Sequence, residues 1–296
     1  MNNSALINRI FILALFTGLA SCGSETKSTK DASDEFAAAE EELKEKISSV
    51  IHELPPPSEV PFLLEATGAD FNESLVNPIE RADSYKSTSQ KSALNLGIYA
   101  TDIGYLSSYN KTQEALNYLN ASKGIADNMG ITGAFDVELL KRFESNLNSR
   151  DSLASIINES VGKADEYLRN DDRTKVAVMV LSGSFVEGLS IATKLVETYP
   201  KDLLPEEAKN LILTPIIRVI LNQEKPLTDL IDMLEDLPAD TELAGLIASF
   251  RELKTIYEES DIEEKISQNQ ADLILSGEYL TAISDKISEI RNSIVN

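Results

Sequence analysis

Few residues in this 296-residue chain can support covalent or metal-based catalysis. It has one cysteine, Cys22, one histidine, His52, and no tryptophan. These counts exclude an intrachain disulfide and a zinc site built from His and Cys ligands. His52 lies just before three prolines and is interpreted as an exposed helix-end residue, which excludes a Ser-His-Asp or Cys-His arrangement within the rest of the chain. The sequence also has no phosphate-binding glycine loop and no EF-hand loop. We therefore predict no enzyme activity, no catalytic residues, no metal and no cofactor.

Signals for β-structure are scarce as well. The chain has no Asn-Gly or Asp-Gly hairpin turn, and only 18 residues are phenylalanine or tyrosine. After Pro61, apolar residues recur at the spacing of one helix face almost to the end of the chain. We predict an all-α fold, with helices near residues 62–67, 78–85, 89–109, 112–129, 134–147, 150–169, 173–198, 205–223, 227–236, 241–260 and 270–294.

Basic residues are few relative to acidic residues. The chain has 27 Lys and Arg residues against 49 Asp and Glu residues, which gives a formal net charge of −22. A surface this acidic repels nucleic acid and anionic lipid headgroups, so we predict no nucleic-acid partner. Solubility is the simplest role of the acidity.

The N-terminus has the order of charged, apolar and small residues that is typical of secretory signals. Arg9 precedes an apolar run that starts at Ile10 and is too short to span a bilayer. The stretch Leu19-Ala20-Ser21-Cys22 resembles the lipobox of bacterial lipoproteins. That resemblance implies cleavage before Cys22 and attachment of a diacylglycerol to its sulfur, and two or three acyl chains in all hold a protein firmly on a membrane. The following Gly23, by resemblance to lipoprotein sorting signals, implies the outer membrane, on a face that the sequence leaves open.

These features divide the chain into four segments. Residues 1–21 are the predicted signal peptide, and without them the chain has 26 basic and 49 acidic residues and a net charge of −23. Residues 22–33 are rich in small and polar residues and form a flexible tether. Residues 34–57 contain a charged helix that ends at a proline spacer. Residues 58–296 form the all-α body.

Two helices are predicted to lie at the centre of the body. The segment Val176–Val186 has no charged residue and contains Gly183, and Gly188 follows it closely. The segment 93–109 carries Gly97 and Gly104. Each internal glycine costs about 1 kcal/mol relative to alanine, and we predict that close packing compensates for this cost. At the start of the body, Asn77-Pro78 is interpreted as an N-cap followed by proline at the first helical position.

One part of the body looks like a tetratricopeptide helix pair. We find no copy of it displaced by about 34 residues, the period that such arrays require. We therefore predict an irregular multi-helix bundle, with tetratricopeptide-like helix pairs as the alternative. The residues that give the likeness are Ala93, Leu96, Gly97, Gly104, Tyr105, Ala115, Leu116 and Leu119.

Asp102 is the most specific candidate for a ligand site. On a helix it shares a face with Tyr99, and Tyr105 lies alongside. Phenol hydroxyls around a carboxylate could line a polar pocket for a sugar, an amine or a metal. The simpler interpretation is a buried aspartate that is bonded within the protein.

Two further charges interrupt apolar runs. Glu187 and Arg218 would each be costly to bury alone, so we predict a buried Glu187–Arg218 ion pair that joins two central helices, or a ligand site that uses one or both. A hydrolase with Asp102 and Glu187 as paired carboxylates is the remaining alternative, and it requires a separation of about 5–9 Å.

Three segments resemble those of uncharacterised helical lipoproteins of Bacteroidota. They are Pro55–Phe71, Leu94–Tyr105 and Gly183–Gly188, the last of which contains Glu187. The resemblance supports the compartment and the helical fold and brings no activity with it. We predict a membrane-anchored, non-catalytic module for protein interaction or scaffolding in the cell envelope, with an envelope protein as partner. The alternative is a lipoprotein that binds a small molecule in the Tyr/Asp-lined pocket.

Overall fold

The computed structural model describes Glu65, Arg142 and residues 70–131, 174–199, 217–238, 240–259 and 278–296, all within the compact unit Glu41–Asn296. No strand occurs in these ranges, so the predicted all-α class is confirmed. The elements are the 3-10 helices η1 (Glu73–Leu75) and η2 (Ile79–Ser87) and the α-helices α3 (Ser89–Ser108), α4 (Thr112–Asn128), α7 (Thr174–Glu197), α9 (Glu224–Glu235), α10 (Thr241–Glu259) and α13 (Glu278–Val295).

Several helix ends follow directly from the local sequence. The side chain of Thr88 caps α3 by accepting a hydrogen bond from the Lys91 N–H at 3.1 Å. After α3, Asn110 adopts a positive φ of 57°, and the Lys111 N–H donates to the Leu106 carbonyl at 2.9 Å. Gly130 has a φ of 69° and ends α4 in the same way. Both are Schellman-type ends, which need a residue that tolerates the left-handed region.

One predicted helix start is wrong. Pro78, and not Asn77, occupies the N-cap position of η2, and it makes no side-chain cap. The Asn77 backbone N–H is instead directed into the body, where it donates to the Asp102 side chain. The predicted segments 1–21, 22–33 and 34–57 and the predicted helices 62–67, 134–147 and 150–169 lie outside the described residues, apart from Glu65 and Arg142. The same holds for residues 205–216 and 270–277 of two further predicted helices.

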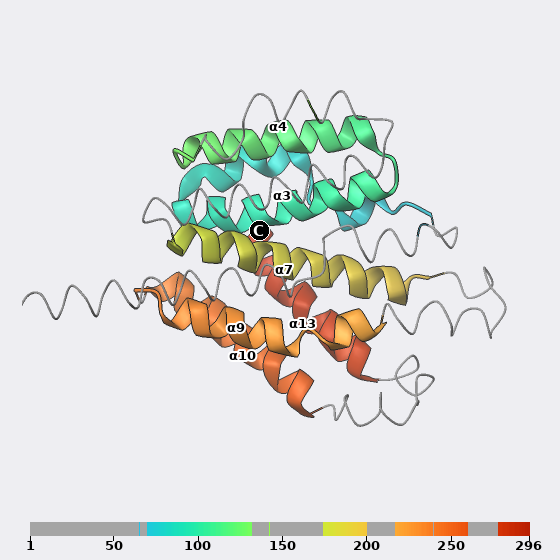
Figure 1. Cartoon of the computed structure of the whole chain (residues 1–296), viewed down its shortest axis with the longest axis vertical. Helices are drawn as coiled ribbons and strands as arrows, with labels where there is room; N and C mark the ends of the chain where they lie inside the picture. Colours follow the sequence, from blue (N-terminus) through green and yellow to red (C-terminus); the bar gives the residue numbers. More distant parts are fainter. Residues whose placement is uncertain are drawn as a thin grey trace, which may run out of the picture. The chain divides into compact units, whose positions relative to one another are not determined.

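The helices pack around α3 and α7. In Figure 1, α3 lies between α4 and α7, and η2 packs against both α3 and α4. Helix α7 also contacts α9 and α13. Helix α10 contacts the same two helices. The pairs α3–α4 and α9–α10 differ in length, with 20 and 17 residues against 12 and 19, so they are not copies of one repeat unit. An irregular bundle describes this packing.

Backbone contact between α3 and α7 explains two of the glycines. A Cβ on Gly97 would lie 2.0 Å from the Val180 carbonyl oxygen, and a Cβ on Gly183 would lie 1.9 Å from the Leu94 carbonyl oxygen. Neither distance is possible for a real side chain, so only glycine permits this approach. The Ser184 hydroxyl then reaches across to donate to the Gly97 carbonyl at 3.1 Å. The predicted close packing at these two positions is confirmed.

Candidate functional site

A buried ion pair joins α7 to α13. Arg291 Nε donates to Glu187 Oε2 at 2.5 Å, and Arg291 Nη2 donates to Glu187 Oε1 at 2.7 Å. The Glu187 side chain is fully buried, and that of Arg291 is 16% exposed. Two parallel bonds between a guanidinium and a carboxylate are the strongest form of such a pair. Burial alone would lower the pKa of Arg291, but the Glu187 carboxylate outweighs it, and the pKa lies above its usual value.

This pair corrects the predicted Glu187–Arg218 bridge. Arg218 is exposed, whereas Ile217, Ile220 and Leu221 around it are buried. On a helix with 3.6 residues per turn, these three share a face that residue 218 does not. The missed partner had a signal in the sequence: Arg291 continues the stripe of Ile283, Ile287 and Ile294 at helical spacing and interrupts it with a charge.

Asp102 lies next to Glu187 on the facing helix α3. Its Oδ2 accepts a hydrogen bond from the Asn77 N–H at 3.1 Å, and the Glu187 carboxyl is its charged neighbour across the contact between α3 and α7. Burial, and then the neighbouring Glu187, raise the pKa of Asp102 well above its usual value. Its Oδ1 has no hydrogen-bond donor. We infer that Oδ1 carries a proton and donates a hydrogen bond to Glu187, so that Asp102 is a neutral carboxylic acid.

Four tyrosines surround one short segment, Asn72–Pro78, which we call the strap. The Tyr105 hydroxyl accepts from the Asn72 N–H at 2.9 Å and lies 3.2 Å from the Asn72 carbonyl. The hydroxyls of Tyr118 and Tyr99 donate to the carbonyls of Asn77 and Pro78, at 3.0 and 2.8 Å. The Tyr85 hydroxyl lies 3.1 Å from Asn77 Oδ1 and 3.1 Å from the carbonyl oxygen of residue 295 in α13.

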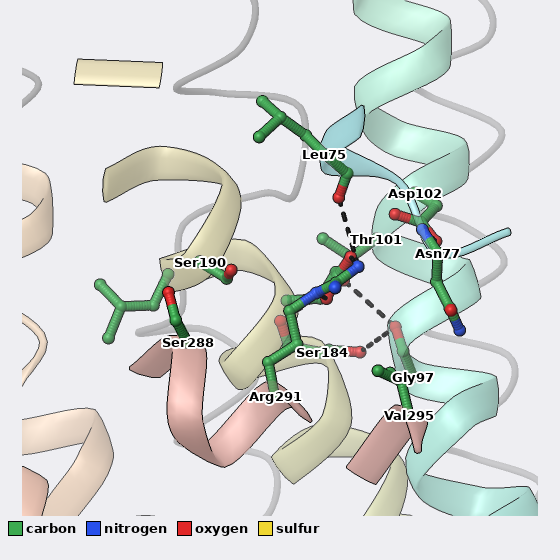
Figure 2. A network of polar contacts seen from close by, with 12 residues as sticks. Leu75, Asn77, Gly97, Thr101, Asp102, Ser184, Ser190, Ser288, Arg291 and Val295 are labelled. Atoms are coloured by element: carbon green, nitrogen blue, oxygen red, sulfur yellow. Dashed lines mark hydrogen bonds and ion pairs between the residues drawn. The ribbon is translucent and has the colours of Figure 1, made fainter. Parts of the chain in front are cut away.

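Arg291 also holds the strap. Its Nη2 donates to the Leu75 carbonyl at 3.3 Å, and Figure 2 shows the side chain extending from α13 toward this oxygen, with Asp102 beside Asn77. Burial raises the pKa of Tyr105 to about 12 and also raises the pKa values of Tyr99 and Tyr118. The phenols therefore stay protonated and keep their hydrogens for the strap.

The structure thus brings together four of the five predicted site residues, Tyr99, Asp102, Tyr105 and Glu187, and separates Arg218 from them. Their contacts are with the protein itself. Sequence reasoning missed Tyr85, Tyr118 and Arg291, which complete the group. A small-molecule pocket at Tyr99, Asp102 and Tyr105 stays a prediction, and its ligand would have to displace the strap.

The paired carboxyls differ from those of a glycosidase. Catalytic carboxyl pairs in glycosidases flank a space for the sugar or a water. Here Glu187 is bound by Arg291, and Asp102 accepts the Asn77 N–H. Within the described ranges, no group of three or more His, Cys, Asp or Glu side chains is arranged to hold a metal ion.

One helix in the described part of the chain, α7, is long and apolar enough to cross a membrane, with a mean hydropathy of 1.7. Most of that stretch, 72%, is buried inside the protein, and it carries the Glu187 carboxylate that binds Arg291. These contacts are those of the core helix of a bundle. No protein-family model matches the chain, and searches of curated proteins and of solved structures found no match either.

Proposed function

We propose that this chain is a lipid-anchored protein of the bacterial outer membrane, whose all-α body is a non-catalytic module for protein interaction or scaffolding. The proposed anchor is Cys22 in the stretch Leu19–Cys22, which resembles a lipobox. Attachment through two or three acyl chains would hold the body at the membrane without a spanning helix.

One observation carries the choice of a non-catalytic module. In the described part of the chain, the polar side chains predicted to form a site, and those found beside them, are buried and bonded to the strap or to one another: Tyr99, Asp102, Tyr105, Tyr118, Glu187 and Arg291. Side chains that hold the protein's own backbone are not presented to a substrate. This favours recognition through the outer surfaces of the helices.

The anchor is tested by the mass of the mature protein and by labelling with fatty acid. The wild-type chain should begin at Cys22 and carry acyl groups, and a Cys22→Ser variant should incorporate none. An unacylated wild-type chain that retains residues 1–21 would contradict the proposal.

The interaction role is tested by photo-crosslinking in intact cells. A photoreactive residue is placed at the exposed positions Asn117 on α4, Arg218, and Ala248 on α10. We expect crosslinked products of one defined mass from whichever of these positions lies on the face that binds the partner, and no crosslinked product from the others. The same photoreactive residue at buried Ile98 serves as the negative control. Recovery of the uncrosslinked chain alone from all three positions would count against a protein partner.

A further inference from the structure

The network around Asp102 is electrically balanced only while one proton is present. Titratable groups face it from each of the four described elements that pack most extensively against α3: Glu187 on α7, Arg291 on α13, Tyr118 on α4 and Tyr85 on η2, with Tyr99 on α3 itself. Glu73 and Glu80 add negative charge near Tyr118. Arg81 lies on η2 and binds residues 295 and 296 at the end of α13.

With Asp102 neutral, the buried centre holds one carboxylate and one guanidinium. Loss of the proton breaks the Asp102 O–H bond, releases the proton to solvent and leaves two adjacent carboxylates that share Arg291. A buried charge without its own partner is costly, and the usual relief is the entry of water.

The strap is the wall through which water can enter most easily. Among the described elements, the other walls are the 3-10 helix η2 and the helices α4, α7 and α13, which contribute buried apolar side chains to one core. In the strap, Glu73, Ser74 and Pro78 are exposed, and only Val76 and Asn77 are buried. Inward it makes hydrogen bonds with Tyr105, Tyr118, Tyr99, Arg291 and Asp102, and of its side chains Leu75 and Val76 pack against the core. Segments with few apolar contacts and exposed backbone open at lower free energy than the packed helices around them.

We propose that the strap is a latch controlled by the proton that Asp102 and Glu187 share: it is closed while the proton is present, and it opens when the proton is lost. The raised pKa of Asp102, caused first by burial and then by Glu187, moves the opening to higher pH than an exposed aspartate would allow. For a body anchored through Cys22, an opened strap of seven residues would span at most about 25 Å and would so lengthen the connection to the anchor. That consequence rests on the proposed anchor, whereas the latch itself does not.

Residue-resolved hydrogen exchange on the full chain in mild detergent, between pH 5 and pH 10, tests the latch. The reporters are the Asn72 and Asn77 amides, which donate to Tyr105 and Asp102, and the references are the Ile98 and Met179 amides inside α3 and α7. Rates are corrected at each pH for the intrinsic exchange of an unfolded peptide. In the wild type, we expect protection at Asn72 and Asn77 to fall by up to about tenfold per pH unit as the pH rises toward the folded-state pKa of Asp102, to level off above it, and to stay well below the protection of the references throughout.

An Asp102→Asn variant should show no such fall, and Asp285→Asn, at an exposed position on α13, should behave as the wild type. Constant protection of the strap up to pH 10, protection of the strap equal to that of the helix references, or the same fall in Asp102→Asn would each overturn the latch. If Asp102→Asn does not fold, as judged by circular dichroism, the contrast between strap and helix amides in the wild type decides the question.

Discussion

Replacing Asp102 with asparagine should make the protein more resistant to alkaline conditions. Asparagine has the shape of a neutral aspartic acid, so its amide N–H can donate to Glu187 and its oxygen can accept the Asn77 N–H that Asp102 now accepts at 3.1 Å. The second amide hydrogen has no partner there, which adds a cost of about 1–3 kcal/mol that does not vary with pH. The variant therefore differs from the wild type in a proton and not in its fold.

The magnitude follows from the linkage between protons and folding. In the unfolded chain Asp102 titrates near 3.8, whereas in the folded protein its pKa is raised. Between these two values the folded state holds one more proton than the unfolded state, so stability falls as pH rises, by about 1.4 kcal/mol per pH unit. Below pH 3.8 this contribution is fully present, and above the folded-state pKa it is lost. Asp102→Asn has no such dependence.

Urea unfolding followed by circular dichroism at pH 4, 5, 6, 7 and 8 measures the effect. The free energy of unfolding of Asp102→Asn minus that of the wild type should rise from pH 4 at the slope above and level off at the folded-state pKa. Other titrating groups cancel in this difference. Asp285→Asn, an exposed control, should give a flat difference within about 0.5 kcal/mol. A flat or falling difference for Asp102→Asn would refute the neutral carboxyl.

Two further predictions concern the helix contacts. Arg291→Leu leaves the buried Glu187 carboxylate without its partner and should lower the free energy of unfolding by about 3–5 kcal/mol in urea titrations. Arg218→Leu, at an exposed position, should change it by less than about 0.5 kcal/mol. Equal losses in the two variants would contradict the reassigned ion pair. Gly97→Ala should lower the free energy of unfolding by about 1–3 kcal/mol because its Cβ meets the α7 backbone. Gly245→Ala, where a Cβ would have nothing within 4 Å, should raise it by about 0.4–1 kcal/mol. A Gly97→Ala variant as stable as the wild type would contradict the backbone contact.

The helices were predictable because their signals are local. Apolar periodicity and breakers such as the Tyr199-Pro200 step placed most ends of the described helices within a few residues: α3, predicted as 89–109, spans Ser89–Ser108, and α7, predicted as 173–198, spans Thr174–Glu197. The burial of Asp102 and Glu187 was also predictable, because each interrupts an apolar helix face.

The partners of the buried groups were harder to predict because they depend on long-range packing. Glu187 and Arg291 lie 104 residues apart in sequence, and Arg218 is the nearer charge within an apolar run. The strap has no helical period, so nothing in its own sequence shows that Tyr105 and Tyr118 bind its backbone. A hydrogen bond to a main-chain carbonyl leaves no mark on the residue that supplies the carbonyl.

The shared proton between α3 and α7 is the central claim, and infrared spectroscopy detects it most directly. Protein with carbon-13-labelled aspartate is measured at pH 6, about two units above the usual pKa of aspartate. The wild type should show the carbonyl band of a neutral aspartic acid, and Asp102→Asn should lack that band. If the spectra of the wild type and Asp102→Asn match and contain only the bands of ionised aspartate, then Asp102 is a carboxylate and no proton joins the two helices.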